Sequence, residues 1–427
     1  MPIIQPPKIV QNAVDDLLAP LFKNKPQRKH LANYLTGLII SENKTVAGMT
    51  NEMPNASDQS CLNPPTPAIP LTEVEWDENA VNETRIDWLQ QFEDTQFHDR
   101  GVIGLDDVLI DKTGKFIKDS GKFWDHSEQR YKHAQDLILI NYLHPHSGKR
   151  YPLEFRRFKK ADQCEWTGEQ FKKMTELSIE LIDWCHQKGV KGTFTFDSFY
   201  TCAEIQNHIN ALQNEDGTHR GYVGDLKFNR KIVFKGVEQQ VQEFAAAIPP
   251  EDRKSVTVDG VKQWYLSVCV KMPNVSHKVR VVILWRYKND KEPRKILVTN
   301  RIHWNAERIV TTYRGRWSCT ETIHRDGKQE LGLGDCQLRG EQGQTRHVYM
   351  VFLAYSLLIR ERDKTNVSDG ACVKLTTIGE SCRALLRDSI RTMIGWIVEQ
   401  LDVPMQRGAK RLEQVLRRLG LCNGQLE

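Results

Sequence analysis

The 427-residue sequence lacks several features that would mark its class. It has no run of about 18 apolar residues, so no membrane-spanning helix is predicted. Its beginning, Met-Pro-Ile-Ile-Gln-Pro-Pro, lacks the charged-then-apolar order of a signal peptide. The ten cysteines are scattered and form no Cys-x-x-Cys pair, which argues against a zinc ribbon or a disulfide scaffold. We therefore expect a protein of the reducing cytoplasm without a membrane partner.

A strong net charge is also missing. The formal charge is +5, with 39% hydrophobic and 27% charged residues, which is typical of a soluble globular protein. Nucleic-acid binding would have to come from the local distribution of charge. The expected regions are a helical N-terminal region (1–95), the first part of an α/β core (96–230), a β-rich insertion (231–300), the rest of the core (301–345) and a helical C-terminal region (346–427).

The two ends of the chain are predicted to be mainly helical. Residues 31–40 carry apolar side chains at helical spacing after a basic stretch, and residues 77–94 also favour a helix. The N-terminal region either binds DNA or forms a plain helical cap. Four prolines within residues 63–70 predict a linker or a rigid turn. Residues 410–420 predict an amphipathic helix that docks on the core or contacts DNA.

The middle of the chain alternates strand and helix patterns. Strands are predicted at 101–110, 136–143, 151–155, 192–197 and 221–228, and helices at 167–186 and 202–213. Three strands, a helix, a strand, a helix and a strand form the order of an RNase H-like α/β core. The following residues 255–299 are rich in β-branched and aromatic residues, and we expect them to form a small antiparallel sheet.

The stretch from 313 to 333 predicts a helix with an unusual charge distribution. It contains no proline and reaches a stop signal at Gly332. Glu321 and Lys328 lie two turns apart on one face, and the same stretch carries Arg314, Arg316 and Arg325. This face suits a carboxylate that holds a metal while cations bind a nearby polyanion. The alternative is a charged helix on the surface.

Three acidic positions stand out at places where α/β folds carry active-site groups. Asp106 or Asp107 lies in the first predicted strand, Asp197 ends the fourth, and Glu321 lies on the predicted helix. Carboxylates within apolar strands are costly unless they are paired or bind a metal. A set of ligands made only of carboxylate oxygens suits Mg²⁺ or Mn²⁺. Two such ions stabilise the attacking and leaving oxygens of an in-line phosphoryl displacement. Alternatively, an aspartate such as Asp197 caps the next helix.

The motifs around these acids resemble those of DDE transposases of the insertion-sequence-four superfamily, most closely the insertion-sequence-seven-hundred-and-one family. The resemblance extends over residues 101–339, and more loosely over 28–94. Leu105-Asp-Asp-Val-Leu is similar to the family's first acidic motif, and Phe196-Asp-Ser-Phe-Tyr to its second. The third motif is Tyr-x2-Arg-x3-Glu-x6-Lys, and Tyr313, Arg316, Glu321 and Lys328 match it in identity.

Two departures from the family leave alternatives open. Four residues separate Arg316 from Glu321 where the family has three, which turns the glutamate by about 100° on a helix. Either Arg314 replaces Arg316 or a bulge absorbs the extra residue. The family's first acid precedes a small hydroxyl residue by two positions, which selects Asp106 over Asp107 and places Val108 where the hydroxyl residue stands.

The resemblance implies a function and a set of roles. It implies an RNase H-like fold, a β-rich insertion before the last catalytic helix, and Mg²⁺-dependent strand cleavage and transfer. Asp106 and Asp197 would bridge two Mg²⁺ or Mn²⁺ ions, and Glu321 would complete one site. Water would cleave the DNA at the element's end, and the freed 3′-hydroxyl would attack a second strand or target DNA. The phosphate near the cut would contact Tyr313, Arg314, Arg316 and Lys328.

The implied partners are double-stranded DNA, as element ends and target, and a second copy of the chain in a homodimeric DNA complex. The DNA-bound protein would associate with the nucleoid. An aromatic of the insertion, Trp264 or Trp285, would stack on a displaced base, or both tryptophans belong to the core. Two rival functions are a DNA-binding descendant without cleavage activity and an RNase H-like nuclease that does not transfer strands.

Overall fold

The computed structural model describes residues 5–52, 69–72, 74–362, 365–368 and 371–401. The chain divides into two compact units. The first consists of Met1–Gln91, Ile110–Ala134 and His324–Glu427, and the second of Phe92–Leu109 and Gln135–Ile323. In the described parts, no helix is both long enough and apolar enough to cross a membrane.

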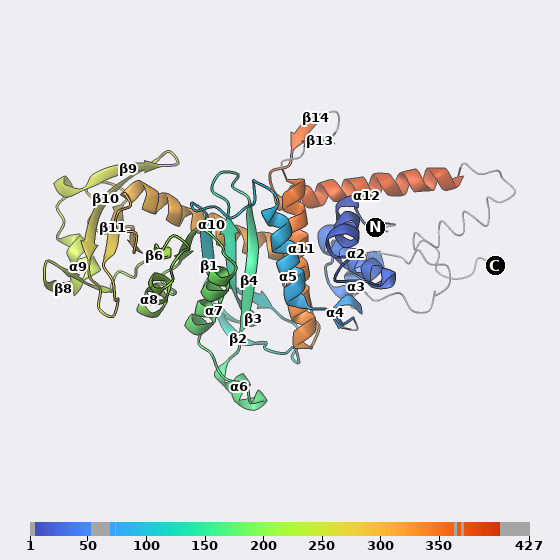
Figure 1. Ribbon diagram of the computed structural model, residues 1–427, viewed down its shortest axis with the longest axis horizontal. Coiled ribbons are helices and arrows are strands. Elements are labelled where there is room, and N and C mark those ends of the chain that lie inside the picture. Colours follow the sequence, from blue (N-terminus) through green and yellow to red (C-terminus); the bar gives the residue numbers. More distant parts are fainter. Residues whose placement is uncertain (1–4, 53–68, 73, 363–364, 369–370, 402–427) are drawn as a thin grey trace. The chain divides into compact units, whose positions relative to one another are not determined.

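The first unit combines segments from both ends of the chain (Figure 1). Its helices are α1 (Lys8–Asn12), α2 (Lys25–Ile40), α3 (Val46–Glu52), α4 (Ile69–Thr72), α5 (Glu78–Gln90), α11 (Glu341–Glu361) and α12 (Ile378–Leu401), with a π-helical turn at Ala13–Leu17. Its short strands are β2 (Gly121–Asp125), which pairs with the beginning of β3 (Arg130–Leu143), and the hairpin of β13 (Thr365–Ser368) and β14 (Ala371–Lys374).

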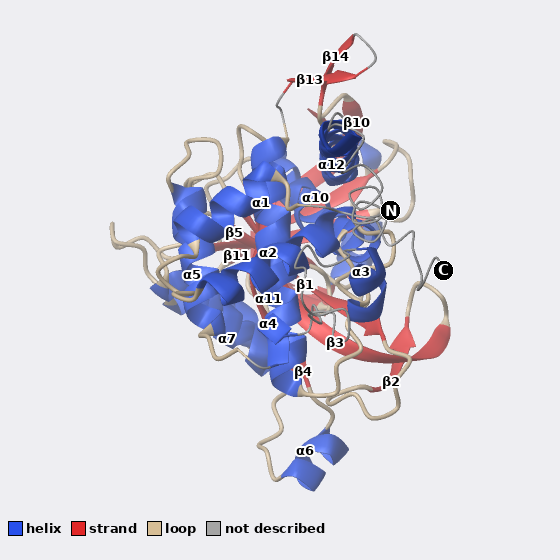
Figure 2. Ribbon diagram, turned by 90° about the vertical axis from the view of Figure 1, so that its right-hand side faces the viewer, coloured by secondary structure: helices blue, strands red, loops and turns tan. Residues whose placement is uncertain are grey.

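Helix α11 forms the centre of this unit and contacts α2, α4, α5 and α12 (Figure 2). The predicted apolar stripe of α2 is confirmed, because Leu31, Tyr34, Leu35 and Leu38 are fully buried. Two buried arginines connect α5 and α11. Arg85 donates to Asn82 and to Ser356 Oγ, and Arg346 binds Glu78 at 2.7 Å. Of the linker or rigid turn predicted at 63–70, residues 63–68 lie outside the described residues, while Ile69 and Pro70 begin the short helix α4. The helix predicted at 410–420 also lies outside the described residues.

The second unit carries most of the sheet. Its strands are β1 (Val102–Asp111), β3, β4 (Arg150–Phe158), β5 (Thr193–Phe196), β6 (Gly221–Asp225), β7 (Lys231–Phe234), β8 (Val237–Gln240), β9 (Lys254–Val258), β10 (Val261–Val270), β11 (Val279–Trp285) and β12 (Lys295–Thr299). Its helices are α6 (Ala161–Thr167), α7 (Met174–Gln187), α8 (Ala203–Ala211), α9 (Val241–Ala246), a 3₁₀ turn at Pro250–Asp252 and most of α10 (Ala306–Glu330).

The strands of this unit follow the order β3-β1-β5-β6-β12-β11-β10-β9, and β4 pairs with the other edge of β3. Strands β1, β5 and β6 are parallel, whereas β12 is antiparallel to β6. The predicted mixed α/β class, with a β-rich segment before the last long helix of the core and flanking helices, is confirmed. The β-rich segment differs from the prediction in one respect. Strands β9–β12 extend the main sheet, because β12 pairs with β6, and do not form a sheet of their own.

The helix predicted at 167–186 is shorter than expected. Thr167 ends α6, Gly168 adopts a positive φ of 73°, and the second helix begins at Met174. Phe171, which lies between the two helices, is 41% exposed. Helical spacing alone did not reveal the break, because glycine is tolerated within many helical patterns.

Helix α10 packs closely on the sheet. The residues near its beginning, Ile309, Val310 and Tyr313, share a buried cluster with Val223 and Leu297 of β6 and β12. Farther along, glycines permit close contact with β1. A Cβ at Gly104 would lie 2.8 Å from Thr320 Cγ2, and one at Gly315 would lie 3.0 Å from Val102 Cγ2. The predicted end of the helix is confirmed, since α10 stops at Glu330 and Gly332 has a φ of +64°.

Replacing Gly104 by valine is therefore expected to lower the free energy of unfolding by about 1–3 kcal/mol, because overpacking displaces neighbouring side chains. Urea denaturation measures the change. Gly340→Ala is the control, since a Cβ there meets no heavy atom within 4 Å, and it should stay within about 0.5 kcal/mol of the native protein. An unchanged urea midpoint for Gly104→Val would contradict the close packing of α10 on β1.

Candidate active site

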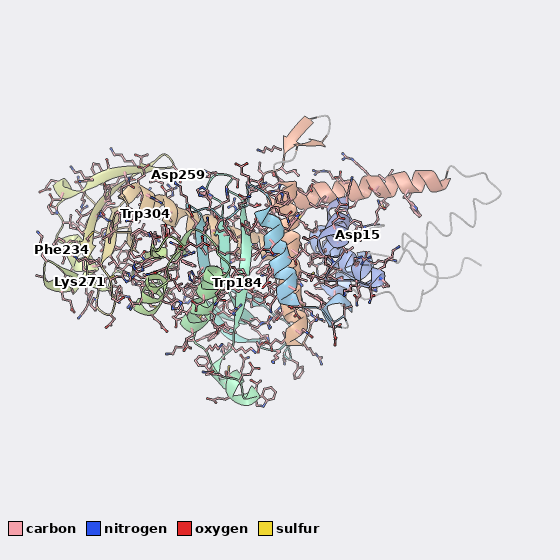
Figure 3. All side chains as sticks on the ribbon, in the orientation of Figure 1. Asp15, Trp184, Phe234, Asp259, Lys271 and Trp304 are labelled. Carbon is pink, nitrogen blue, oxygen red and sulfur yellow. The ribbon has the colours of Figure 1, made fainter. Side chains whose placement is uncertain are left out.

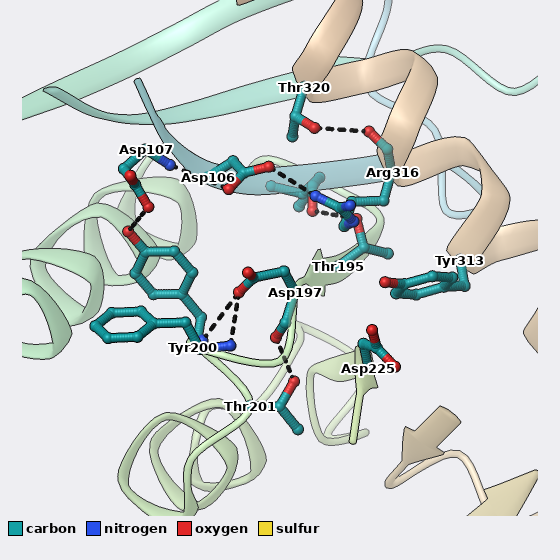
Figure 4. A network of polar contacts seen from close by, with 12 residues as sticks. Asp106, Asp107, Thr195, Asp197, Tyr200, Thr201, Asp225, Tyr313, Arg316 and Thr320 are labelled. Atoms are coloured by element: carbon teal, nitrogen blue, oxygen red, sulfur yellow. Dashed lines mark hydrogen bonds and ion pairs between the residues drawn. The ribbon is translucent and has the colours of Figure 1, made fainter. Parts of the chain in front are cut away.

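The parallel strands bring three aspartates into one row. The register pairs Gly104 with Thr195 and Phe196 with Gly224. Continuing the first pairing by two residues places Asp106 beside Asp197. Continuing the second pairing by one residue places Asp197 beside Asp225. Asp197 and Asp225 lie at the carboxyl ends of β5 and β6, where open α/β sheets bind their ligands, and Asp106 lies in the middle of the longer strand β1. Figure 4 shows these aspartates together with Arg316 and Tyr313 of α10.

Asp197 is held by the turn that follows β5. Its Oδ1 accepts hydrogen bonds from the backbone N–H groups of Phe199 and Tyr200, at 2.8 and 3.2 Å. Thr201 donates its hydroxyl to the backbone carbonyl of Asp197 at 2.6 Å. Asp197 thus caps a turn, while α8 begins only at Ala203 with Cys202 as its N-cap. Among the described residues, Asp197 Oδ2 accepts no hydrogen bond, so this oxygen is available to a ligand.

Asp106 pairs with Arg316 across β1 and α10. Arg316 Nη1 lies 2.6 Å from Asp106 Oδ2, and the two side chains are 10% and 15% exposed. Burial raises the pKa of Asp106 to about 7, although the positive charge of Arg316 opposes this shift. The negative charges of Asp107, Asp197 and Glu321 raise the same pKa further. The pair therefore lies within a group of mutually repelling carboxylates.

Asp107 belongs to a second polar group beside the first. Tyr200, which is fully buried, donates its hydroxyl to Asp107 Oδ1 at 2.8 Å. Asp136 of β3 is also buried, and its Oδ1 has no hydrogen-bond partner within the described structure. Burial and the negative charge of Asp107 raise the pKa of Asp136 well above its usual value. The side chain of Asp106, and not that of Asp107, is the one paired with Arg316.

Helix α10 supplies the remaining predicted residues. Glu321 is half-buried, and its carboxylate has no hydrogen bond or ion pair among the residues described. Tyr313 is buried, with its hydroxyl 3.4 Å from Lys295 Nζ, and Lys295 binds Asp225 at 3.0 Å. Lys328 is an exposed residue farther along the helix.

The structure separates the two arginines that the sequence left as alternatives. Arg316 points to Asp106, whereas Arg314 donates to the carbonyl of Val258 at 2.6 Å and lies 3.3 Å from Asp259. Residues 306–330 form one continuous α-helix. The extra residue between Arg316 and Glu321 is therefore not absorbed by a bulge of the helix.

The carboxylate oxygens of the site suit a hard cation, but among the described residues they are not arranged around a common metal position. In the described residues, no three His, Cys, Asp or Glu side chains are arranged to hold a metal ion. Asp106 Oδ2 is engaged by Arg316, and Asp197 Oδ1 by backbone N–H groups. Asp197 Oδ2 and the Glu321 carboxylate accept no hydrogen bond from the described residues, and carboxylate oxygens are the ligands that Mg²⁺ and Mn²⁺ prefer. The residues present thus fit such an ion in chemistry.

The two tryptophans of the β-rich segment have different surroundings. Trp285 is fully buried, and the guanidinium of Arg253 lies 4.1 Å from its ring centroid. Trp264 is half-buried, with the ammonium groups of Lys262 and Lys288 above its ring at 5.2 and 5.3 Å. Trp285 is therefore a core residue, whereas part of Trp264 is accessible.

Sequence reasoning missed three residues of this site. Asp225 closes the apolar stretch Gly-Tyr-Val-Gly just as Asp197 closes Thr-Phe-Thr-Phe, and this parallel could have identified it. Asp136 opens an apolar strand, where a carboxylate is unusual. Tyr200 gave no signal, because its contact with Asp107 joins residues that are 93 positions apart.

The Arg316–Asp106 pair is expected to be strongly coupled. Arg316→Met should lower the free energy of unfolding by about 3 kcal/mol, since it leaves a largely buried carboxylate without its cation. Asp106→Asn should cost less, and the double variant should be more stable than the sum of the single effects predicts by at least about 1 kcal/mol. Urea denaturation in the presence of EDTA measures all four proteins. Strict additivity would contradict the coupling.

Comparison with known proteins adds one finding. Residues 179–357 match the family model described as a transposase DDE domain. The matched segment contains Asp197 and Glu321 and ends within α11, whereas Asp106 precedes it. No curated protein matches the chain. The match supports a DDE transposase, and the large mixed sheet with its flanking helices is consistent with the RNase H-like fold of such enzymes.

Proposed function

We propose that this protein is an insertion-sequence transposase, of the insertion-sequence-four superfamily and its seven-hundred-and-one family, that cuts DNA at the element's ends and joins the 3′-hydroxyl to target DNA. The observation that carries the proposal is the row of Asp106 and Asp197 on adjacent parallel strands, with Glu321 and Arg316 supplied by the helix above β1. The family match over residues 179–357 supports the same class of enzyme.

Asp106, Asp197 and Glu321 are the proposed ligands of two Mg²⁺ or Mn²⁺ ions. When bound, the ions supply charge stabilisation for the attacking and leaving oxygens of an in-line phosphoryl displacement. The protein contributes the position of each carboxylate. The turn after β5 fixes Asp197, the pair with Arg316 fixes Asp106, and α10 carries Glu321.

Arg316 has two roles in this proposal. Without a cation, it compensates the charge of Asp106 within the group of carboxylates. When DNA binds, the same guanidinium would contact the phosphate next to the cut. Tyr313, Arg314 and Lys328 are the other proposed phosphate contacts, and they position the DNA without reading its sequence.

The proposed partners are double-stranded DNA, as element ends and as target, and a second copy of the chain in the DNA complex. The exposed part of Trp264 and its two flanking lysines support contact of the β-rich segment with nucleic acid. The proposed location is the cytoplasm, with association to the nucleoid when the protein binds DNA.

A second candidate is a DNA-binding descendant that no longer cleaves. The observation in its favour is the 2.6 Å ion pair, in which Arg316 already occupies one carboxylate oxygen of Asp106. In this alternative, Arg316 substitutes permanently for the cation. Cleavage in the presence of Mg²⁺ distinguishes the two functions.

The first test is Mg²⁺-dependent nicking of supercoiled DNA that carries the element's ends. Asp197→Ala and Asp197→Asn should each lower the nicking rate by at least about a hundredfold, because even changes next to a metal ligand cost about 10–100-fold. Asp197→Asn keeps an oxygen for the N–H groups of Phe199 and Tyr200, so it separates loss of a metal ligand from loss of the turn. EDTA should abolish nicking.

The control for this test is Asp183→Asn, which changes a carboxylate on α7 that pairs with His208. It should nick at the native rate, and all variants should bind the DNA nearly as well as the native protein. Unchanged nicking by Asp197→Asn would remove the assignment of this residue. Absence of nicking by the native protein would favour the DNA-binding descendant.

The second test asks whether the protein transfers strands. The native protein with Mg²⁺ should join a pre-cut element end with a free 3′-hydroxyl to a target plasmid, because the same carboxylates serve both displacement steps. Glu321→Gln should lower joining and nicking in parallel, and gel analysis of labelled ends measures both. A native protein that nicks but never joins would instead be an RNase H-like nuclease.

A further inference from the structure

The second unit contains a cavity at the edge of the sheet opposite the acidic row. Its volume is about 540 Å³. Thr193, the first residue of β5, lines it, whereas Asp197 follows the last residue of the same strand. The segment before β6, the segment after β12 and the beginning of α10 complete the wall. None of the residues proposed to hold metal lines this cavity.

A buried arginine in the wall has unsatisfied donors. Arg220 is 4% exposed, and its Nε and Nη2 have no hydrogen-bond partner within the described part of the chain. Its guanidinium lies 5.0 Å from the ring centroid of Phe194, which supports one face of the planar group. A buried guanidinium without acceptors is costly, and the cavity that Arg220 lines is the place where an acceptor can approach this group.

Arg301 is held beside Arg220 by the strand register. Thr299 pairs with Val223, so Arg301, two residues later, lies opposite Gly221 in the antiparallel pair. A Cβ at Gly221 would lie 2.3 Å from Arg301 Nε, and only glycine leaves room for the guanidinium there. The Nε of Arg301 also has no hydrogen-bond partner among the described residues.

A third arginine completes the cluster. Arg308, in the first turn of α10, has its guanidinium 3.9 Å from the ring centroid of Trp304, which is labelled in Figure 3. Burial lowers the pKa of Arg220 and of Arg301. The positive charge of Arg301 lowers the pKa of Arg220 further, and that of Arg308 lowers the pKa of Arg301, although the negative charge of Asp216 opposes this second shift. The three cations therefore repel one another, and an anion between them would relieve this repulsion.

The carboxylates near the cavity form no ion pair with the cluster in the described structure. Asp99, Glu215 and Asp216 line it, but all three are exposed. Asp216 Oδ1 accepts hydrogen bonds from the N–H and hydroxyl groups of Thr218. In the described structure, no ion pair joins Arg220, Arg301 or Arg308 to any carboxylate. Among the described residues, the cluster therefore has no counter-ion in direct contact, and Asp216 acts on Arg301 only through its charge at a distance.

We propose that this cavity is a binding site for a phosphate group, contacted by Arg220, Arg301 and Arg308. A guanidinium presents paired N–H donors that match the oxygens of a phosphate, and three such groups converge here. The positive end of the α10 dipole favours the same charge. The phosphate belongs either to the backbone of a DNA duplex or to a free phosphate. The site is independent of cleavage, because it shares no residue with the acidic row.

Calorimetric titration of the native protein with inorganic phosphate, at low salt and with EDTA, tests the site. One phosphate should bind per chain. Arg301→Gln should weaken this binding by about tenfold or more, the effect of a lost charge-assisted hydrogen bond. Arg220→Gln should do the same, and its urea midpoint shows whether it remains folded. Arg230→Gln, an exposed arginine outside the cavity, is the matched control and should bind as the native protein does.

A second experiment, the binding of a DNA duplex, identifies the source of the phosphate. If the site binds the DNA backbone, Arg301→Gln should weaken duplex binding and inorganic phosphate should compete with the duplex. If duplex affinity is unchanged while phosphate binding is lost, the ligand is a free phosphate. The proposal is overturned if phosphate shows no saturable binding, or if Arg301→Gln and Arg230→Gln bind it equally. Asp197→Ala should bind phosphate normally, so failure of the proposed cleavage activity leaves this result unaffected.

Discussion

The compensation of negative charge around Asp106 is the constraint on which the site depends. A carboxylate that is largely withdrawn from water, with Asp107, Asp197 and Glu321 nearby, is stable only beside a cation or in its protonated form. Arg316 meets this need in the structure. Because Arg316 and Glu321 lie on the same helix, the position of α10 decides both the compensating charge and one of the acids. The close packing at Gly104 of β1 and Gly315 of α10 therefore helps to place both charges.

The parallel sheet converts distant sequence positions into neighbours. Asp106 and Asp197 are far apart in the chain, yet the register of β1 and β5 brings them side by side. A third acid, Asp225, follows from the register of β6, and Lys295 neutralises it. Two of the three aspartates in the row thus have an internal cation. Asp197, in the middle, is held by backbone N–H groups, and its second oxygen remains accessible.

The sequence allowed the order of core elements, the end of α10 and the buried stripe of α2 to be predicted, because local periodicity and glycine signals determine each of them. It did not allow the break at Gly168 or the pairing of β12 with β6 to be predicted, since both depend on tertiary contacts. The choice between Arg314 and Arg316 also required the structure. Arg314, two turns before Glu321, lies on nearly the same helix face as the glutamate, whereas Arg316, five residues before it, is turned away. Only the packing of α10 on β1 shows that Arg316 reaches Asp106, while Arg314 binds the carbonyl of Val258.

The two edges of the parallel sheet pose the same electrostatic problem with opposite signs. At the carboxyl edge, an excess of carboxylates is partly resolved within the chain, by Arg316 for Asp106 and by Lys295 for Asp225. At the amino edge, Arg220 and Arg301 are brought together by Gly221 and the strand register, and no described carboxylate pairs with them. A chain under pressure for stability alone would place a carboxylate there or replace the buried arginine by an apolar side chain, which is often more stable than a buried charge. Two arginines in the wall of a cavity that form no ion pair with the described residues are best explained by an anion that the chain does not itself contain.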